Sequence, residues 1–470
     1  MLKKILCLLL VGLMLISTVS CATSDTEDAT TSTETQAVAP EDTELKPELP
    51  DKKYTGTTFR ILADAAQYKY IAAEKSDGSL INDAIVESNM AVMEQFDIKF
   101  ERINGSPDVF ISSGDDAYDV AYLHDCTTAT LSLRKFFRNV YDMPYMDPTA
   151  PWWPQFTTDA LTLNGKMFFY SNYTGYLSMA QTRACMFNQD ILRNYNISAP
   201  YDLVRDGTWT IDKAMELSTA IYSDLNGNGL SDDGDLFGFA ATHYPWGWLE
   251  AFGIELYQKE GPNSANLSVV VDDRCYTLVE KLNEWFFSGK NSVMVAFEGG
   301  GDPVVTMFAE EQVAFTFALH LAEQVAPALQ NNVNYGIVPF PKIDVNQENY
   351  YGACTDYLFS IPTTIKDAEM VGAVLEAMAY NGYKFIRPAY CEQTLQSRYA
   401  TDPDCADMLN LILDNRVISF AYLFSQSVSG GLQSNLIANA TPQMTLGSLA
   451  KSTVKAEQKS LKKITQLYED

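Results

Sequence analysis

The sequence predicts an α/β fold with largely parallel β-sheets. Short apolar segments with strand character alternate with amphipathic helical segments along most of the chain, and this alternation is typical of α/β architectures. Several of the strand segments end at polar residues, as they do where loops gather at the carboxyl edge of a parallel sheet. Residues 54–470 carry this pattern and are enough for two sizeable hydrophobic cores.

The first predicted elements begin soon after residue 54. Residues 57–64 (TTFRILAD) alternate in polarity and stop at a polar turn, which predicts a strand. Residues 80–103 have apolar residues at helical spacing and then continue into a second strand, DIKFERI. Residues 117–125 predict a third strand, which a helical segment, TATLSLRKFF, follows.

The middle of the chain continues the alternation. A tight turn at 163–166 (LNGK) leads into a predicted strand, KMFFYS, at 166–171. Residues 182–196 predict a strand followed by a short helix. Residues 209–224 form an amphipathic helical pattern, and Thr210 is suited to cap its N-terminus.

The last third adds helices and further strands. Residues 274–290 predict a helix, and 302–320 predict a helix followed by a strand. Residues 334–342 and 356–364 predict two more strands. From residue 366 onwards the pattern is mostly helical.

The N-terminus has the layout of a secretory signal. Lys3 and Lys4 precede an apolar run, residues 5–16, that is too short to span a bilayer. The sequence TVSC at 18–21 resembles a bacterial lipobox, although Thr18 stands where Leu is usual. We therefore expect a signal peptide at 1–20 and lipidation of Cys21. Ordinary cleavage at the small residues Ser20-Cys21-Ala22 is the alternative.

The segment after the signal is polar and acidic. Residues 22–50 contain almost no large apolar side chains, so they cannot bury enough surface to fold. Residues 21–53 are therefore predicted to be a disordered acidic tether, rich in Ser and Thr. Together these features predict an exported lipoprotein on the outer face of the cell membrane, in the periplasm if the cell has an outer membrane.

Charge and cysteine content exclude several classes of function. The formal net charge is −27, which argues against nucleic acid and disfavours direct binding to an anionic membrane surface. The six cysteines beyond Cys21 show no metal-ligand spacing and the chain has only three histidines, so a zinc site is not expected. The sequence does not decide whether Cys391 and Cys405 form a disulfide.

Residues 224–235 resemble a calcium-binding EF-hand loop. Gly229 stands at the sixth position, where the sharp turn needs it. The twelfth residue is Asp rather than Glu, and a strand follows instead of a second helix, so we expect a structural calcium site and not a sensor. An ion-free polar turn is the alternative. The predicted ligands are Asp224, Asn226, Asn228, the Leu230 carbonyl, Asp232 and Asp235.

Longer stretches of the sequence resemble the extracellular solute-binding proteins of bacterial carbohydrate ABC importers, of the family 1 type. The stretches follow one another in register from about residue 54 to about residue 425. They are INDAIVESNMAVMEQFDIKF, YDVAYLHD, PWWPQFTTDALTLNGKMFF, ACMFNQDILRNYNISAPYDLVRDGTWTIDKAMELS, DLNGNGLSDDGDLFGF, NYGIVPFPK and SRYATDPDCADMLNLILDNRV.

This resemblance implies a two-lobed, periplasmic-binding-protein-like fold of type II, with a ligand cleft between α/β lobes that close about a hinge. Residues 54–172 plus 318–356 would form the first lobe, and 173–317 plus 362–470 the second. The chain would cross between lobes near 171–182, 312–320 and 355–362. The resemblance implies a monomeric receptor that is not an enzyme. It would capture a carbohydrate, by family analogy an oligosaccharide, and deliver it to ABC transporter permease subunits.

A saccharide site needs aromatic platforms and a few polar side chains. At predicted strand ends of the first lobe the candidates are Asp64, Tyr122, His124 and Asp125. Near the crossings they are Tyr173, Arg183, His320, Asp356 and Tyr357, with Tyr176 close by. Trp246 and Trp248 lie in a turn-rich segment, and Trp152 and Trp153 in a proline-bounded loop. For each of these residues, packing or capping is the alternative.

Two other functions are alternatives to carbohydrate capture by a transport receptor. The same fold can bind a non-sugar solute such as a peptide, or serve a sensory partner. An exported glycoside hydrolase would need two carboxylates held about 5–10 Å apart across a sugar. The sequence contains 60 acidic residues, so the presence of carboxylate pairs is not evidence for a hydrolase.

Overall fold

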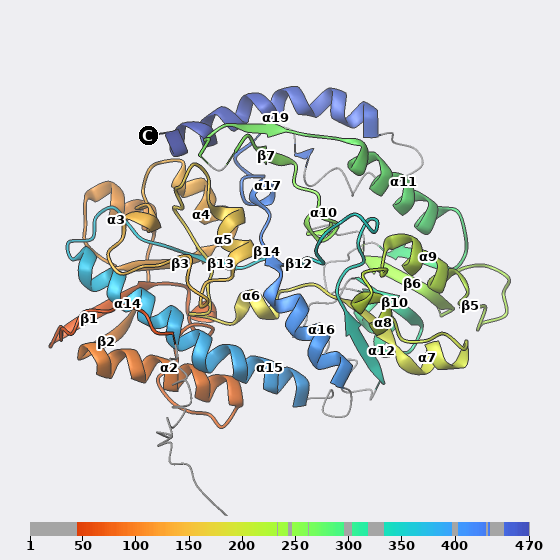
Figure 1. Ribbon diagram of the computed structural model, residues 1–470, viewed down its shortest axis with the longest axis horizontal. Coiled ribbons are helices and arrows are strands. Elements are labelled where there is room, and N and C mark those ends of the chain that lie inside the picture. Colours follow the sequence, from red (N-terminus) through yellow and green to blue (C-terminus); the bar gives the residue numbers. More distant parts are fainter. Residues whose placement is uncertain are drawn as a thin grey trace, which may run out of the picture. The chain divides into compact units, whose positions relative to one another are not determined.

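Two β-sheets organise residues 46–470, which form one compact unit in this computed structural model. The structure describes residues 45–232, 234–242, 247–261, 263–295, 303–317, 333–396, 403–428, 431–432 and 446–469. The signal peptide, Cys21 and most of the tether therefore lie outside the described residues. Figure 1 shows the unit that holds both sheets.

The first sheet has the strand order β13-β3-β1-β2. Its three N-terminal strands run parallel, as predicted, and β13 joins the sheet antiparallel to β3. Helix α2 connects β1 to β2; the Ser79 side chain caps its start by accepting from the Asn82 N–H. The strands are β1 (Thr57–Leu62), β2 (Ile98–Ile103), β3 (Val120–His124) and β13 (Tyr357–Ser360), and the helices along this part are α1 (Ala65–Tyr68), α2 (Leu80–Phe96), α3 (Pro107–Ser113), α4 (Asp125–Ser132), a 3₁₀ turn (Val140–Asp142), α5 (Gln155–Leu161) and α6 (Leu177–Ala180).

A long helical segment near the C-terminal end of the chain packs beside α2 (Figure 1). It consists of α14 (Ala368–Asn381), a π-helical turn (Gly382–Ile386) and α15 (Arg387–Gln396). Most of α14 is buried, so it needs neighbours on several sides. The expected lobe division placed these residues in the second lobe, whereas here they pack against α2, the helix that connects β1 and β2 of the first sheet.

The second sheet has the order β11-β4-β10-β6-β5, with β9 paired to β6. Helix α9 packs on β6, and the Thr210 hydroxyl accepts from the Lys213 N–H, as predicted for its N-cap. The strands are β4 (Cys185–Asn188), β5 (Tyr222–Ser223), β6 (Leu236–Thr242), β9 (Ser292–Val295), β10 (Val313–Thr316) and β11 (Tyr335–Val338), and the helices are α7 (Gln189–Asn194), α8 (Tyr201–Arg205), α9 (Ile211–Thr219), α10 (Trp248–Ala251), α11 (Asp273–Phe287) and α12 (Pro303–Ala309).

Three expectations about the path of the chain differ from the structure. Strand β11 was expected in the first lobe, within 318–356, but it pairs antiparallel with β4 of the second sheet. Strand β10 was expected at a crossing, 312–320, but it lies inside the second sheet between β4 and β6. Residues 166–171 do not form a strand, because the segment makes only isolated bridges, such as Tyr170 to Phe359.

Segments from distant parts of the sequence meet at a short parallel ladder. Strands β12 (Gly352–Ala353) and β14 (Arg416–Val417) pair with each other, and β14 contacts α5 while β12 contacts α10. Helix α16 (Pro403–Asp414) leads into β14 and packs on β11, and α17 (Phe420–Leu423) follows β14 and contacts α4. The ladder therefore joins elements from both halves of the chain.

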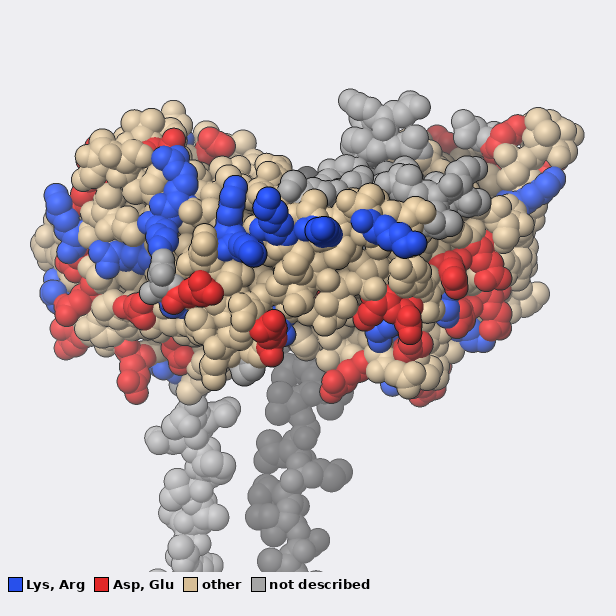
Figure 2. Space-filling model, turned by 90° about the horizontal axis from the view of Figure 1, so that it is seen from above, with Lys and Arg blue, Asp and Glu red and all other residues tan. Residues whose placement is uncertain are grey.

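The C-terminal helix α19 (Leu446–Glu469) packs against the β7–β8 hairpin (Tyr257–Lys259 and Leu267–Val269). Its Gln458 side chain accepts from the Val269 N–H at 2.7 Å and donates to the Leu267 carbonyl at 2.9 Å. The opposite face carries exposed lysines, visible among the basic side chains of Figure 2; they are Lys451, Lys455, Lys459, Lys462 and Lys463.

Within the described residues, no helix has both the length and the apolar character needed to cross a membrane. Cys391 and Cys405 are free thiols, so the disulfide left open by the sequence is not formed. The Cys405 thiol lies 3.1 Å from the Tyr201 hydroxyl instead.

Candidate functional site

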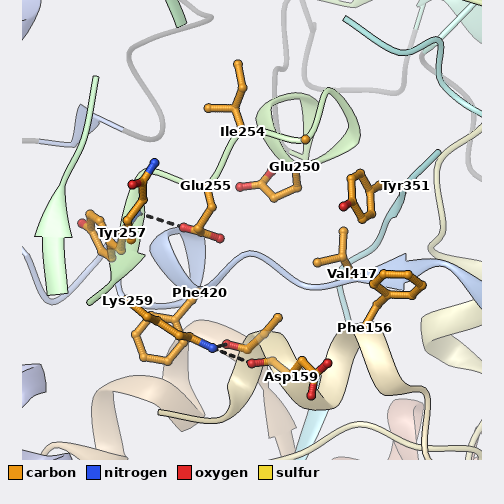
Figure 3. A pocket seen from close by; sticks show the side chains of 13 residues that line it. Phe156, Asp159, Glu250, Ile254, Glu255, Tyr257, Lys259, Tyr351, Val417 and Phe420 are labelled. Carbon is orange, nitrogen blue, oxygen red and sulfur yellow. Dashed lines mark hydrogen bonds between the residues drawn. The ribbon is translucent and has the colours of Figure 1, made fainter. Parts of the chain in front are cut away.

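A cavity of about 460 Å³ lies beside the β12–β14 ladder (Figure 3). Helix α5 forms one wall, and α10 with the chain leading into β7 forms the other. Four aromatic residues and three acidic residues contribute to it. The cavity is lined by Phe156, Asp159, Ala160, Glu250, Gly253, Ile254, Glu255, Tyr257, Gln258, Lys259, Tyr351, Val417 and Phe420.

The α5 wall is fixed to the ladder by its buried face. The Thr157 hydroxyl donates to the Arg416 carbonyl at 2.9 Å, and this bond holds α5 against β14. The neighbouring Phe156 ring is thereby turned toward the cavity, where it meets Tyr351 edge to face with 5.7 Å between the ring centres. Both rings are only partly buried, so they offer apolar surface to a ligand.

The opposite wall is held by the core of the second sheet and by α19. Trp248 anchors α10 because its ring is 1% exposed and packs against Phe317 and Phe340. Beyond α10, the Tyr257 hydroxyl donates to Glu457 of α19 at 2.6 Å. The segment that carries Glu250 and Glu255 is therefore fixed at both ends.

The carboxyl groups of Glu250 and Glu255 lie near each other on this wall (Figure 3). Burial, and then the charge of Glu250, raises the pKa of Glu255 to about 8. The Glu255 carboxylate accepts a hydrogen bond from the Tyr257 N–H at 3.0 Å, and the charge of Lys259 also acts against the rise. Lys259 itself donates to the carbonyls of Asp159, Ala160 and Thr162 at the end of α5.

Such a cavity combines flat apolar surface with strong hydrogen-bond acceptors. Aromatic rings suit the C–H faces of a sugar ring, and carboxyl groups accept hydrogen bonds from its hydroxyls. The arrangement is therefore suited to binding a saccharide.

The structure brings six of the predicted ligand residues together at a second place, around the end of β3. Tyr357 lies opposite His124 in the register of β13 and β3, and their rings are 5.6 Å apart. The Tyr122 hydroxyl donates to the Asp356 carboxylate at 3.1 Å. Burial raises the pKa of Asp356 to about 7. The group is completed by Asp125, whose carboxylate is 3.0 Å from His124, and by the exposed Asp64, whose charge acts on Tyr357.

Only part of this strand-end group is accessible. Tyr122, Asp125 and Asp356 are 1%, 1% and 7% exposed, whereas His124 and Asp64 face solvent. His124, Asp125 and Cys126 have ligand atoms within 4.8 Å of one another. Burial raises the pKa of the Cys126 thiol to about 12, so the thiolate needed for metal binding is disfavoured. Of the predicted ligand residues that the structure describes, none lines the cavity beside the ladder.

The remaining predicted ligand residues are buried or outside the described chain. Tyr173 is 3% exposed and lies under the Arg416 guanidinium, 5.1 Å from its ring centre. Arg183 is 8% exposed, and its N–H donates to the Ala353 carbonyl. Trp248 belongs to the core, in agreement with the packing alternative for that residue. Trp246 and His320 lie outside the described residues.

The residues that line the cavity were not predicted from the sequence as ligand residues. Its residues come from four separate segments, and each segment alone looks like ordinary packing. The nearest signal was PWWPQF, since Phe156 follows the tryptophans that were considered. Trp152 and Trp153 themselves are buried and donate to Glu376 of α14.

The loop 224–235 contains oxygen ligands of the kind that calcium prefers. The Asp224 carboxylate accepts from the N–H groups of Gly227 and Gly229, at 2.6 and 2.7 Å, which folds the loop around it. Asp232 accepts from the side-chain amides of Asn226 and Asn228. Asp235 is fully buried, and Tyr222 donates to it and to the Leu230 carbonyl. This all-oxygen donor set fits a hard cation once the two amides turn their oxygens inward.

Comparison with solved structures identifies the fold. The GacH receptor of Streptomyces glaucescens, whose structures were determined unliganded and with acarbose, is 14% identical and aligns over 86% of this chain and 98% of its own, with a TM-score of 0.52. UspC of M. tuberculosis is 13% identical and aligns over 86% of this chain and all of its own, with a TM-score of 0.56. The chain has the α/β fold of periplasmic-binding-protein-like receptors.

At sequence level, no family model and no curated protein matches this chain. The structural matches have low identity, so they establish the fold alone.

Proposed function

We propose that this protein is an exported solute receptor that binds a carbohydrate in the cavity beside the β12–β14 ladder. The observation that carries this proposal is the lining of the cavity, which has a volume of about 460 Å³. Partly exposed aromatic rings and acidic side chains line it together. The fold supports it, because GacH, a receptor of the same fold, was crystallised with acarbose.

The proposal extends to delivery and location. The signal-like N-terminus and the lipobox-like sequence before Cys21 favour a lipoprotein held on the outer face of the cell membrane. A receptor there would pass its ligand to ABC transporter permease subunits, with closure about the ladder where the two halves of the chain meet. The monomeric state expected from the sequence is part of this proposal.

The aromatic platform can be tested by truncating one ring. We expect Tyr351→Ala to weaken saccharide binding about tenfold, because the ligand would lose an apolar face worth more than 1 kcal/mol. Isothermal titration against a glycan panel measures this effect. Phe287→Ala removes an exposed ring elsewhere, on α11, and should leave affinity unchanged.

The same experiment separates receptor from enzyme and sugar from peptide. A receptor leaves the glycan intact, so product analysis after titration should show no cleavage. Release of any shorter glycan would contradict the receptor function and favour the glycoside hydrolase. Binding of peptides but no glycan would contradict the carbohydrate assignment.

We also propose that residues 224–235 hold a structural calcium ion. The ligands would be the Asp224, Asp232 and Asp235 carboxylates, the Asn226 and Asn228 side-chain oxygens and the Leu230 carbonyl. Because these residues lie between α9 and β6, the ion would stabilise the edge of the second sheet. No part of ligand binding is assigned to it.

Removal of calcium tests this site. We expect EGTA to lower the melting temperature by about 5 °C, since binding at a hundredfold excess over Kd contributes about 2.7 kcal/mol. Asp224→Ala should lower it similarly and abolish the response to EGTA, whereas Asp115→Ala, at an exposed residue, should keep that response. An Asp224→Ala melting temperature equal to wild type, with and without EGTA, would rule the site out.

A further inference from the structure

The outer face of α19 carries a row of basic side chains. All five of its lysines are exposed; they are Lys451, Lys455, Lys459, Lys462 and Lys463. With 3.6 residues per turn they lie within an arc of about 120°, and with a rise of 1.5 Å per residue they extend over about 18 Å. Figure 2 shows basic side chains in a row on this side of the molecule. We call this face the basic stripe; it belongs to a chain whose formal net charge is −27.

The packing of α19 fixes which of its faces is turned outward. The opposite face is buried through Leu461, Ile464 and Leu467, each at most 4% exposed. Glu457, the one acidic residue of the helix before Glu469, is 1% exposed and accepts from the Tyr257 hydroxyl at 2.6 Å and from the Leu432 N–H at 3.2 Å. Because Glu457 points inward, it does not neutralise the basic stripe.

The lysines of the basic stripe have no acidic partners within the described part of the chain. None of the five pairs with a carboxylate there, whereas Lys213 pairs with Glu216 and Lys281 with Asp212 on other helices. Like charges one turn apart on a helix repel each other. A negatively charged partner would remove this repulsion, so the charge of the stripe identifies its partner as an anionic one.

The other side chains of the stripe favour a layer of phosphate groups over an acidic protein. Between the lysines the outward positions are small, namely Ser452, Ala456 and Ser460. Protein interfaces depend on aromatic residues and arginine and are depleted of lysine, and the stripe has neither aromatic residues nor arginine. A cluster of four to eight basic residues on an amphipathic helix is instead typical of contact with anionic lipid headgroups.

We propose that the basic stripe lies against anionic phospholipid headgroups of the membrane on which the receptor is held. This inference rests on the location in the proposed function and adds a contact beyond the lipid at Cys21. The net charge disfavours such contact for the molecule as a whole, but charges farther than about 8 Å from the membrane are screened at physiological salt. Each lysine within that distance raises partitioning onto an anionic surface about fivefold.

Sedimentation with lipid vesicles tests this contact. The protein begins at residue 22, so it carries no lipid of its own and keeps the compact unit of residues 46–470. The vesicles contain either equal parts of phosphatidylglycerol and phosphatidylcholine or phosphatidylcholine alone. We expect binding to the anionic vesicles but not to the neutral ones. This binding should be lost as NaCl is raised from about 0.1 to about 0.5 M, because salt screens exposed charges.

Three double variants locate the contact on α19. Lys455→Gln with Lys459→Gln should weaken binding to the anionic vesicles about 25-fold, at about fivefold for each lysine. Lys455→Arg with Lys459→Arg keeps the charge and should bind as wild type does. Lys75→Gln with Lys99→Gln removes two exposed lysines before α2 and in β2, and it should also bind as wild type does.

The possible results separate this inference from the receptor function. Absence of binding to anionic vesicles, equal binding to neutral ones, or equal losses in the two glutamine variants would each overturn the inference. Capture of the protein by polyaspartate without binding to vesicles would overturn it too, since the stripe would then suit an acidic polypeptide. In all these cases glycan titration decides the receptor function separately. Vesicle binding without any glycan binding would contradict the carbohydrate receptor and support the membrane contact.

Discussion

Replacing Glu376 by Leu should lower the free energy of unfolding by about 3 kcal/mol. The Glu376 side chain is fully buried in α14 and accepts hydrogen bonds from the indole N–H groups of Trp152 and Trp153, at 2.6 and 3.2 Å. Both tryptophans are at most 3% exposed, so neither N–H can turn to water after the substitution. Each buried donor left without an acceptor costs about 1–3 kcal/mol.

Urea unfolding followed by tryptophan fluorescence measures the change, and Glu369→Leu provides the matched control. Glu369 lies on the same helix, is 62% exposed and pairs with Lys52 at 3.8 Å. Its replacement should change stability by less than about 0.5 kcal/mol. Equal unfolding midpoints for the two variants would contradict the role assigned to Glu376.

A comparison of wild type with Glu376→Gln tests how the stability contributed by Glu376 depends on pH. Burial raises the pKa of Glu376 from 4.5 to about 7. Between those values the folded state keeps a proton that the unfolded state has lost, so the contribution of Glu376 to stability falls as pH rises from about 4.5 to about 7. Gln does not titrate, so wild type should lose stability relative to Glu376→Gln across this window.

Replacing Gly382 by Ala should destabilise the protein by about 3 kcal/mol, at the upper end of overpacking costs. A Cβ atom at this position would lie 1.9 Å from the Tyr173 carbonyl oxygen and 2.5 Å from its carbon. The backbone at Gly382 is helical, with φ −63° and ψ −42°, so Ala would gain about 1 kcal/mol of helix propensity. The overlap outweighs this gain because the neighbour is backbone in a buried segment and cannot rotate away.

Gly261→Ala is the control for this substitution. No heavy atom lies within 4 Å of a Cβ at Gly261, and its backbone does not need a positive φ. Its unfolding midpoint in urea should match wild type, while that of Gly382→Ala should shift to lower urea. Unchanged stability of Gly382→Ala would show that the π-helical turn and residues 173–174 do not pack as closely as described.

The sequence predicted those features that depend on neighbouring residues. The helix over 80–96 and its return into β2 follow from local periodicity, and Thr210 caps its helix because its hydroxyl reaches an N–H group only three residues ahead. The parallel pairing of β1 with β2 and β3 followed from the alternation of strands and helices. Residues 166–171 have strand composition but make only isolated bridges, which composition cannot reveal.

The candidate site was less predictable because its geometry is non-local. Tyr357 and His124 come together through strand pairing between residues more than two hundred positions apart. The sequence placed His124 at a strand end and Tyr357 near a crossing, but it could not show that the two are neighbours. It could not show that Trp248 packs in the core while Glu250, two residues later, reaches the cavity wall. That difference depends on which face of the short helix α10 meets the second sheet.

By itself, the sequence determined the α/β class, the helix starts and the acidic composition, because these follow from local periodicity, capping and residue counts. The tertiary structure decided that β11 joins the second sheet, that α14 and α15 pack against α2, and that Phe156, Tyr351 and Glu255 share one cavity. It also placed five exposed lysines along α19 of a chain with net charge −27. These features depend on contacts between distant residues, and burial of apolar surface selects those contacts only when the whole chain folds.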